Sequence, residues 1–185
     1  MNDIKKLREM TGAGLADCKK ALAESEDMDG AVAYLRKKGQ AVAAKRSDRD
    51  ASEGCVLVKA ENGFGAIIAL KCETDFVANN ADFVALTQEI LDAAVANKCK
   101  TLDEVKALPM GSGNVRDAGT ERSGITGEKM ELDGYCVIEG ENIATYNHMN
   151  RNSLCTMLAL SKSVEDATVG KNIAMQIASA APVAI

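Results

Sequence analysis

The sequence has few aromatic residues, no tryptophan and a single histidine. Aromatic residues make up 3% of the 185 residues and apolar residues 46%, so we expect a packed core of aliphatic side chains. A basic excess is also missing. The net charge of −5 argues against direct binding to nucleic acid, where neutralisation of phosphates supplies much of the affinity. No apolar run approaches the roughly 20 residues that cross a bilayer, so we expect no membrane partner.

Close pairs of metal-ligating residues are missing as well. None of the six cysteines forms a C-x-x-C pair and none clusters with His148, so we expect no metal site. The first residues, "MNDIKKLREM", lack the apolar stretch of a secretory signal. We therefore expect a cytoplasmic protein whose cysteines are reduced and buried.

Nucleotide-binding and hydrolytic motifs do not occur. There is no G-x-x-x-x-G-K-[ST], and "TGAG" (11–14) follows a predicted helix rather than a strand, so it is interpreted as a turn between helices. There is no G-x-S-x-G, which leaves Cys155 or Cys136 with His148 as the one possible catalytic pair. A lone histidine at a strand end is more often a surface residue, so we predict neither a cofactor nor an enzyme.

The first 52 residues have helical spacing. Ile4, Leu7 and Met10 fall on one face of a first helix, a second follows "TGAG", and we expect Asp29 to cap a third that Gly39 ends. Eleven Lys/Arg stand against nine Asp/Glu here, and eleven against eighteen in the remainder. This change predicts a domain boundary near residue 52.

The periodicity then changes to that of strands. Two apolar runs flank "ENGFG" in 54–71, which predicts a hairpin, and residues 81–97 return to helical spacing. The same order recurs in 139–162 and 169–182. We predict an α+β protein: a three-helix bundle with a linker (1–52), a first core lobe (53–128) and a second lobe (129–185). Within these lobes, "KMELDGYCVIEG" (129–140) is expected to be a strand and "GSGNVRDAGTERSGITG" (111–127) mainly loop.

The stretch "CETDFVANN" (72–80) places a scarce phenylalanine in a polar setting. Thr74 or Asp75 could cap a short helix, with Phe76 packed inward against it. Alternatively, Phe76 is exposed and anchors a partner. The corresponding point of the second hairpin, "SVEDATVGKN", has no aromatic residue, so the fold alone does not require one there.

These segments together resemble a known family. "KKLREMTGAGLADCKKAL" (5–22) and "CETDFVANNADF" (72–83), followed by "LDAAVA", "EGENIATYNH" and "IAMQIASAAP", are similar to bacterial translation elongation factor Ts over essentially the whole chain. The resemblance implies a guanine nucleotide exchange factor for elongation factor Tu, with a ubiquitin-associated-like N-terminal bundle and a core of two subdomains. It implies no covalent chemistry and no cofactor of its own, since Mg²⁺ and GDP belong to the partner.

The resemblance also implies which residues act. The family's intruding loop matches Thr74, Asp75, Phe76 and Val77, which would disturb the Mg²⁺ and nucleotide site of the partner. The turn after the first helix would bind the partner through Arg8, Leu15 and Ala16, and the core through His148. Many members have two methionines where Leu15-Ala16 stands, so we expect a smaller contact there.

Two further expectations complete this interpretation. Family members of this pattern continue past "PVAI", so we expect a fragment whose second lobe is incomplete. The alternative function is a ubiquitin-associated-like protein-binding module without exchange activity, which requires no role for Phe76.

Overall fold

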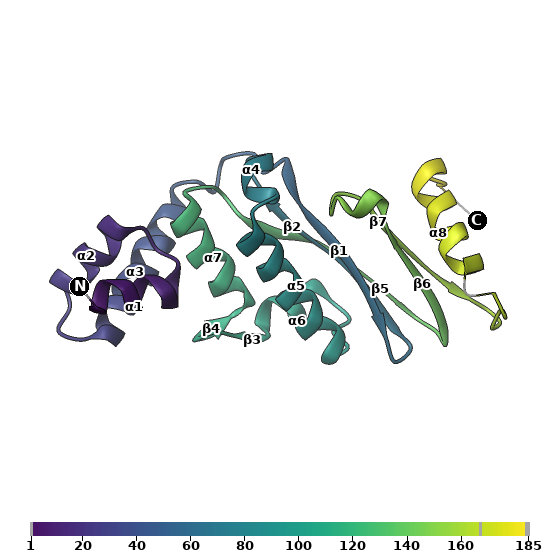
Figure 1. Cartoon of the computed structure of the whole chain (residues 1–185), viewed down its shortest axis with the longest axis horizontal. Helices are drawn as coiled ribbons and strands as arrows, with labels where there is room; N and C mark the ends of the chain where they lie inside the picture. The colour runs from purple at the N-terminus through teal and green to yellow at the C-terminus, as the bar shows by residue number, and fades with distance from the viewer. Residues whose placement is uncertain (1, 167, 184–185) are drawn as a thin grey trace.

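The computed structural model describes residues 2–166 and 168–183. The molecule is elongated, with a helical bundle at one end, a sheet covered by helices in the middle, and a hairpin with one helix at the other end (Figure 1). The first helix lies in the bundle, and the last helix lies at the opposite end. Helices and antiparallel strands are both abundant, which confirms the predicted α+β class.

The bundle consists of α1 (Asn2–Thr11), α2 (Leu15–Ala23) and α3 (Met28–Ala44). Small side chains allow these helices to pack closely. The buried residues of this bundle are Leu7, Ala13, Cys18, Ala21 and Ala31.

Two predictions about α3 are wrong. Asp27, not Asp29, caps the helix, and its carboxylate accepts a hydrogen bond from the N–H of Gly30 at 2.7 Å. The helix continues through Gly39, which is buried, and ends at Ala44. A helix ends at a glycine only where the backbone turns; Gly39 instead lies where another helix crosses closely.

The central sheet has three strands in the order β1-β2-β5, where β5 is Glu131–Glu139, and is antiparallel throughout. β1 (Glu53–Glu61) and β2 (Phe64–Cys72) form the predicted hairpin, closed by Asn62 and Gly63 with φ of +50° and +76°. An Asn-Gly pair suits this two-residue turn because both positions require positive φ.

The predicted strand at 129–140 is confirmed as β5 (Glu131–Glu139), but it pairs with β2. The central sheet therefore includes a strand that we had assigned to the second lobe. The sequence shows that a strand exists but not its neighbour, since the paired residues lie 60 to 75 positions apart along the chain.

Helices on one face of the sheet complete the main core. α4 (Asp75–Ala78), α5 (Ala81–Ala96) and α6 (Leu102–Ala107) follow β2 along the chain (Figure 1). Every second residue of β2 is buried, and these residues meet the apolar side of α5. The largest fully buried side chains of this core are Phe64, Phe83, Ile68, Leu70, Ile90 and Leu91.

The segment predicted as loop contains a helix. The short pair β3 (Pro109–Met110) and β4 (Gly113–Asn114) leads into α7 (Val115–Thr126). Asn114 and Asp117 form a capping box, and Gly127 ends the helix in the left-handed conformation. α7 packs on α3, and a Cβ added at Gly124 would lie 2.5 Å from the Cα of Gly39. Gly124 and Gly39, which have no side chains, allow the two helices to cross at this distance.

The second hairpin lies against the central sheet and carries one helix. β6 (Asn142–Asn147) and β7 (Cys155–Leu160) are joined through the short 3-10 turn η1 (His148–Asn150). The side chain of Ile143 points to Gly65 of the central sheet, whereas Ala144 points to Gly170 of α8 (Thr168–Ala180). The expected hairpin and helix are therefore both present, with the hairpin between the sheet and α8.

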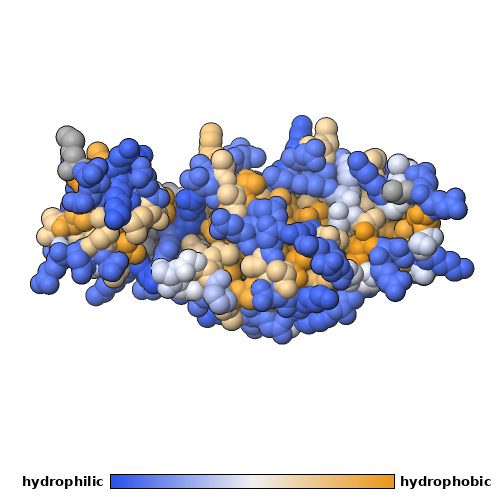
Figure 2. Space-filling view, turned by 60° about the horizontal axis from the view of Figure 1, so that its bottom comes forward, coloured by the Kyte–Doolittle hydropathy of each residue, from blue (hydrophilic) through white to orange (hydrophobic). Residues whose placement is uncertain are grey.

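Surface hydropathy differs along the molecule. On the face drawn in Figure 2, hydrophilic residues cover most of the bundle at the left, whereas hydrophobic residues gather over the middle and right-hand parts. Among the described residues, no helix has the length and apolar character that crossing a membrane requires.

Candidate functional site

The short helix α4 presents Phe76 to solvent. Thr74 is its N-cap, and the Thr74 hydroxyl accepts a hydrogen bond from the N–H of Val77 at 3.4 Å. Asp75 and Phe76 point outward, while Val77 is half-buried and Ala78 is buried against the core. The exposed fraction of Phe76 is 86%, whereas the other two phenylalanines are at most 1% exposed. The inward-packed interpretation of Phe76 is therefore wrong.

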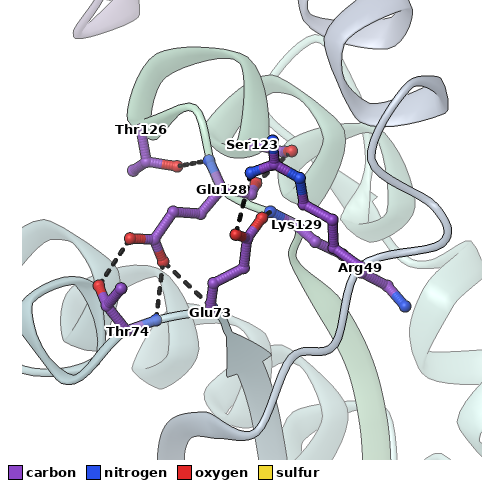
Figure 3. Close-up of polar contacts among 7 residues, drawn as sticks. All are labelled: Arg49, Glu73, Thr74, Ser123, Thr126, Glu128 and Lys129. Atoms are coloured by element: carbon purple, nitrogen blue, oxygen red, sulfur yellow. Dashed lines mark hydrogen bonds and ion pairs between the residues drawn. The ribbon is translucent and has the colours of Figure 1, made fainter.

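A polar network anchors the chain just before this helix (Figure 3). The Glu128 carboxylate accepts hydrogen bonds from the backbone N–H groups of Glu73 and Thr74, both at 3.1 Å, and from the Thr74 hydroxyl at 2.6 Å. In return, the Glu73 carboxylate accepts one from the N–H of Lys129 at 2.6 Å and pairs with Arg49 at 3.1 Å. We call these five residues the Glu73–Glu128 clamp. It joins the linker after the bundle, the turn before α4 and the segment after α7.

The clamp shifts the pKa of Glu73 and that of the neighbouring Cys72. The N–H of Lys129, and then Arg49, lower the pKa of the Glu73 carboxyl below its usual value. Burial, together with the negative charge of Glu128, raises the pKa of the neighbouring Cys72 thiol to about 11. Cys72 therefore stays protonated at neutral pH and donates a hydrogen bond to the carbonyl of Thr74 at 3.2 Å.

The turn between α1 and α2 exposes a second apolar surface. Arg8, Leu15 and Ala16 are exposed, and Met10 lies beside them with an exposed fraction of 56%. Gly12 adopts a φ of +68° in this turn, and a Cβ there would lie 3.5 Å from the Ile125 side chain of α7. The turn is thus supported by the core, with its apolar residues facing solvent.

His148 lies in the turn between β6 and β7 and is half-buried. Its Nδ1 is 3.2 Å from the Tyr146 hydroxyl, and the two rings meet edge to face. The adjacent Met149 is exposed. This turn is tied to the central sheet through the N–H of Val56, which donates to the carbonyl of Asn152 at 2.6 Å.

The structure gives no support to a thiol nucleophile at Cys155. Burial raises the pKa of this thiol to about 12, and its Sγ donates to the carbonyl of Val56. An activated cysteine requires the opposite shift. Cys136 is exposed, contrary to the prediction that all six cysteines are buried. Within residues 2–166 and 168–183, no three His, Cys, Asp or Glu side chains are grouped so as to hold a metal ion.

Comparison with known proteins decides the family. The family model described as "Elongation factor TS" matches residues 73–185. The elongation factor Ts of Porphyromonas gingivalis is 52% identical over the whole chain, which covers 68% of that relative. The chain belongs to the elongation factor Ts family. The elongation factors Ts of Bacteroides fragilis and Bacteroides thetaiotaomicron are 70% and 68% identical over the whole chain, which covers 56% of each.

The match to the elongation factor Ts model begins at Glu73, a member of the clamp, and includes α4 and the elements that follow it, but not β1 and β2. Sequence reasoning singled out Thr74 to Val77 in this region but missed Glu73, Glu128 and Arg49. Single acidic and basic residues in loops do not stand out in a charged sequence. The contacts that unite them join residues 24 to 56 positions apart in the sequence.

Proposed function

We propose that the chain acts in translation elongation as a nucleotide exchange factor that binds elongation factor Tu in its GDP state. The observation that carries this proposal is the exposure of Phe76, which has 86% of its surface accessible to solvent. Phe76 lies on a one-turn helix, and hydrogen bonds hold the residues that precede this helix. Fold requirements do not explain Phe76, because its side chain lies outside the core. An exposed aromatic side chain of this kind is typical of a residue that anchors a protein partner.

In this proposal, Thr74, Asp75, Phe76 and Val77 form the segment that enters the partner near its nucleotide-bound Mg²⁺. Mg²⁺ demands near-ideal octahedral oxygen ligation, so a small shift of the surrounding loops weakens its binding. Loss of the ion leaves phosphate charge uncompensated and releases GDP more readily. Coupling is reciprocal, so GDP weakens binding of the factor by the same ratio.

One side chain cannot supply the whole effect. Burial of Phe76 contributes about 1.5–3 kcal/mol, whereas a change of roughly 10⁴ in affinity requires about 5.5 kcal/mol. We propose that Arg8, Leu15 and Ala16 on the bundle and His148 on the core supply further contacts. The bundle (1–52) would then serve as a ubiquitin-associated-like binding module beside the core lobes. Such a factor acts in the cytoplasm and needs no cofactor of its own.

The test is release of fluorescent GDP from elongation factor Tu. The 185-residue chain is expected to accelerate release, and Phe76→Ala and Asp75→Ala to reduce that acceleration, each by about tenfold or more. Absence of acceleration by the unsubstituted chain would sink the proposal. Unchanged acceleration with Phe76→Ala would remove the role of the α4 segment, and binding retained by residues 1–52 alone would favour a simple binding module.

A further inference from the structure

Glu128 makes three hydrogen bonds to the turn that carries the α4 helix. Its two carboxylate oxygens accept from the N–H groups of Glu73 and Thr74 and from the Thr74 hydroxyl (Figure 3). The carboxylate thus satisfies backbone donors that have no partner within a helix of four residues. Hydrogen bonds to an ionised acceptor are stronger than those between neutral groups.

The position of Glu128 is itself fixed from α7. Its carbonyl accepts a hydrogen bond from the Ser123 hydroxyl, and its N–H donates to the Thr126 hydroxyl at 3.2 Å (Figure 3). The preceding Gly127 adopts the left-handed conformation that ends α7 and turns the chain toward the clamp. Glu128 is therefore held by one helix while it holds the beginning of another.

A helix of one turn is not stable by itself, because the conformational entropy lost in forming the first turn exceeds the stabilisation from its hydrogen bond. The direction in which Asp75 and Phe76 project is then set by what holds the two ends of the turn. The buried Ala78 anchors the far end, and Glu128 anchors the near end.

We propose that Glu128 is a positioning residue, which fixes the Asp75–Phe76 segment in the orientation that enters the partner. This inference rests on the proposed exchange function. Glu128 is half-buried, and its carboxylate contacts Glu73 and Thr74 rather than Asp75 or Phe76, so it acts through the turn. Misplacing an interacting group by about 1 Å can cost a rate factor near a hundredfold, so a fixed turn matters more than its few contacts suggest.

The first experiment measures amide hydrogen exchange in the free chain. Glu128→Ala is expected to lower protection of the Glu73, Thr74 and Val77 amides by about tenfold or more, while α5 stays protected. Glu128→Gln is the conservative variant, since its oxygen can still accept the two N–H groups and its amide can donate to Thr74. Glu139→Ala, which removes an exposed carboxylate paired with Lys100, is the matched control and leaves all these amides unchanged.

The second experiment is a double-mutant cycle in the GDP-release assay. Glu128→Ala is expected to lower the rate at saturating factor by about tenfold, with a smaller change in the half-saturating concentration because the α1–α2 turn is untouched. Glu128→Gln retains most of the rate. In the Phe76→Ala background, Glu128→Ala should have less than about a twofold further effect, because it acts through the same side chain.

The outcomes separate the two proposals. Unchanged protection of the Glu73 and Thr74 amides in Glu128→Ala, or a full additional loss in the Phe76→Ala background, overturns the positioning role. If the unsubstituted chain does not accelerate GDP release, the exchange function fails. The hydrogen-exchange result then decides by itself whether Glu128 orders the turn.

Discussion

Two phenylalanines on consecutive helices occupy opposite environments. Phe76 on α4 is 86% exposed, whereas Phe83 on α5 is fully buried. We expect Phe76→Ala to change the free energy of unfolding by no more than about 0.5 kcal/mol. Phe83→Ala should lower it by about 3–5 kcal/mol, because it leaves a cavity in the main core. Urea denaturation of both variants makes this comparison, and a large loss in Phe76→Ala would mean that the side chain packs inward.

The Glu73 carboxylate makes the clamp sensitive to acid. Its pKa is lowered from 4.5 by the N–H of Lys129 and by Arg49 and Arg46. A group whose pKa is lowered by folding stabilises the protein above its unfolded value and loses this effect as the pH falls through the folded value. The stability lost in Glu73→Gln should therefore be constant near neutral pH and shrink below about pH 5. Urea denaturation across this range measures it, and a loss that grows on acidification contradicts the assignment.

At the scale of elements, α7 is a helix that the sequence alone did not predict. Hairpins and amphipathic helices were predictable because their apolar periodicity is local, as in β1–β2 and α5. In α7, Gly119 and Gly124 lower helix propensity, and the compensating contact with α3 lies far away in the sequence. Thr74 was predictable as a cap from its neighbours, but its tie to Glu128 was not, since that tie depends on where α7 ends.

The two glycines of α7 should respond to alanine with opposite signs. A Cβ at Gly119 meets no atom within 4 Å, so Gly119→Ala should stabilise the protein by about 0.5–1 kcal/mol through helix propensity. A Cβ at Gly124 would lie 2.5 Å from Gly39, so Gly124→Ala should destabilise it as the helices move apart. Thermal unfolding of both variants tests this, and stabilisation by Gly124→Ala would refute the close crossing.

At the scale of the whole molecule, the α3–α7 crossing connects the two exposed segments. The α1–α2 turn belongs to the bundle and the α4 turn to the core, and in the proposed function both bind one partner. Arg36 of α3 pairs with Glu121 of α7, beside the contact between Gly39 and Gly124. Arg49 links the chain after α3 to the clamp. If both segments bind one partner as proposed, a connection that holds them at a fixed separation reduces the entropy lost on binding.

This connection also predicts how the molecule unfolds. A bundle of about forty residues lies near the lower size limit for independent stability, so it should depend on its contact with α7. In native-state hydrogen exchange under urea, α1–α3 and α5 should open with similar free energies in the unsubstituted chain. Gly124→Val should lower the opening free energy of the bundle more than that of α5. Gly119→Val is the matched control, because it makes the same change of side chain and of helix propensity at an open site. An equal effect of both variants on the bundle would show that the crossing does not couple the two parts.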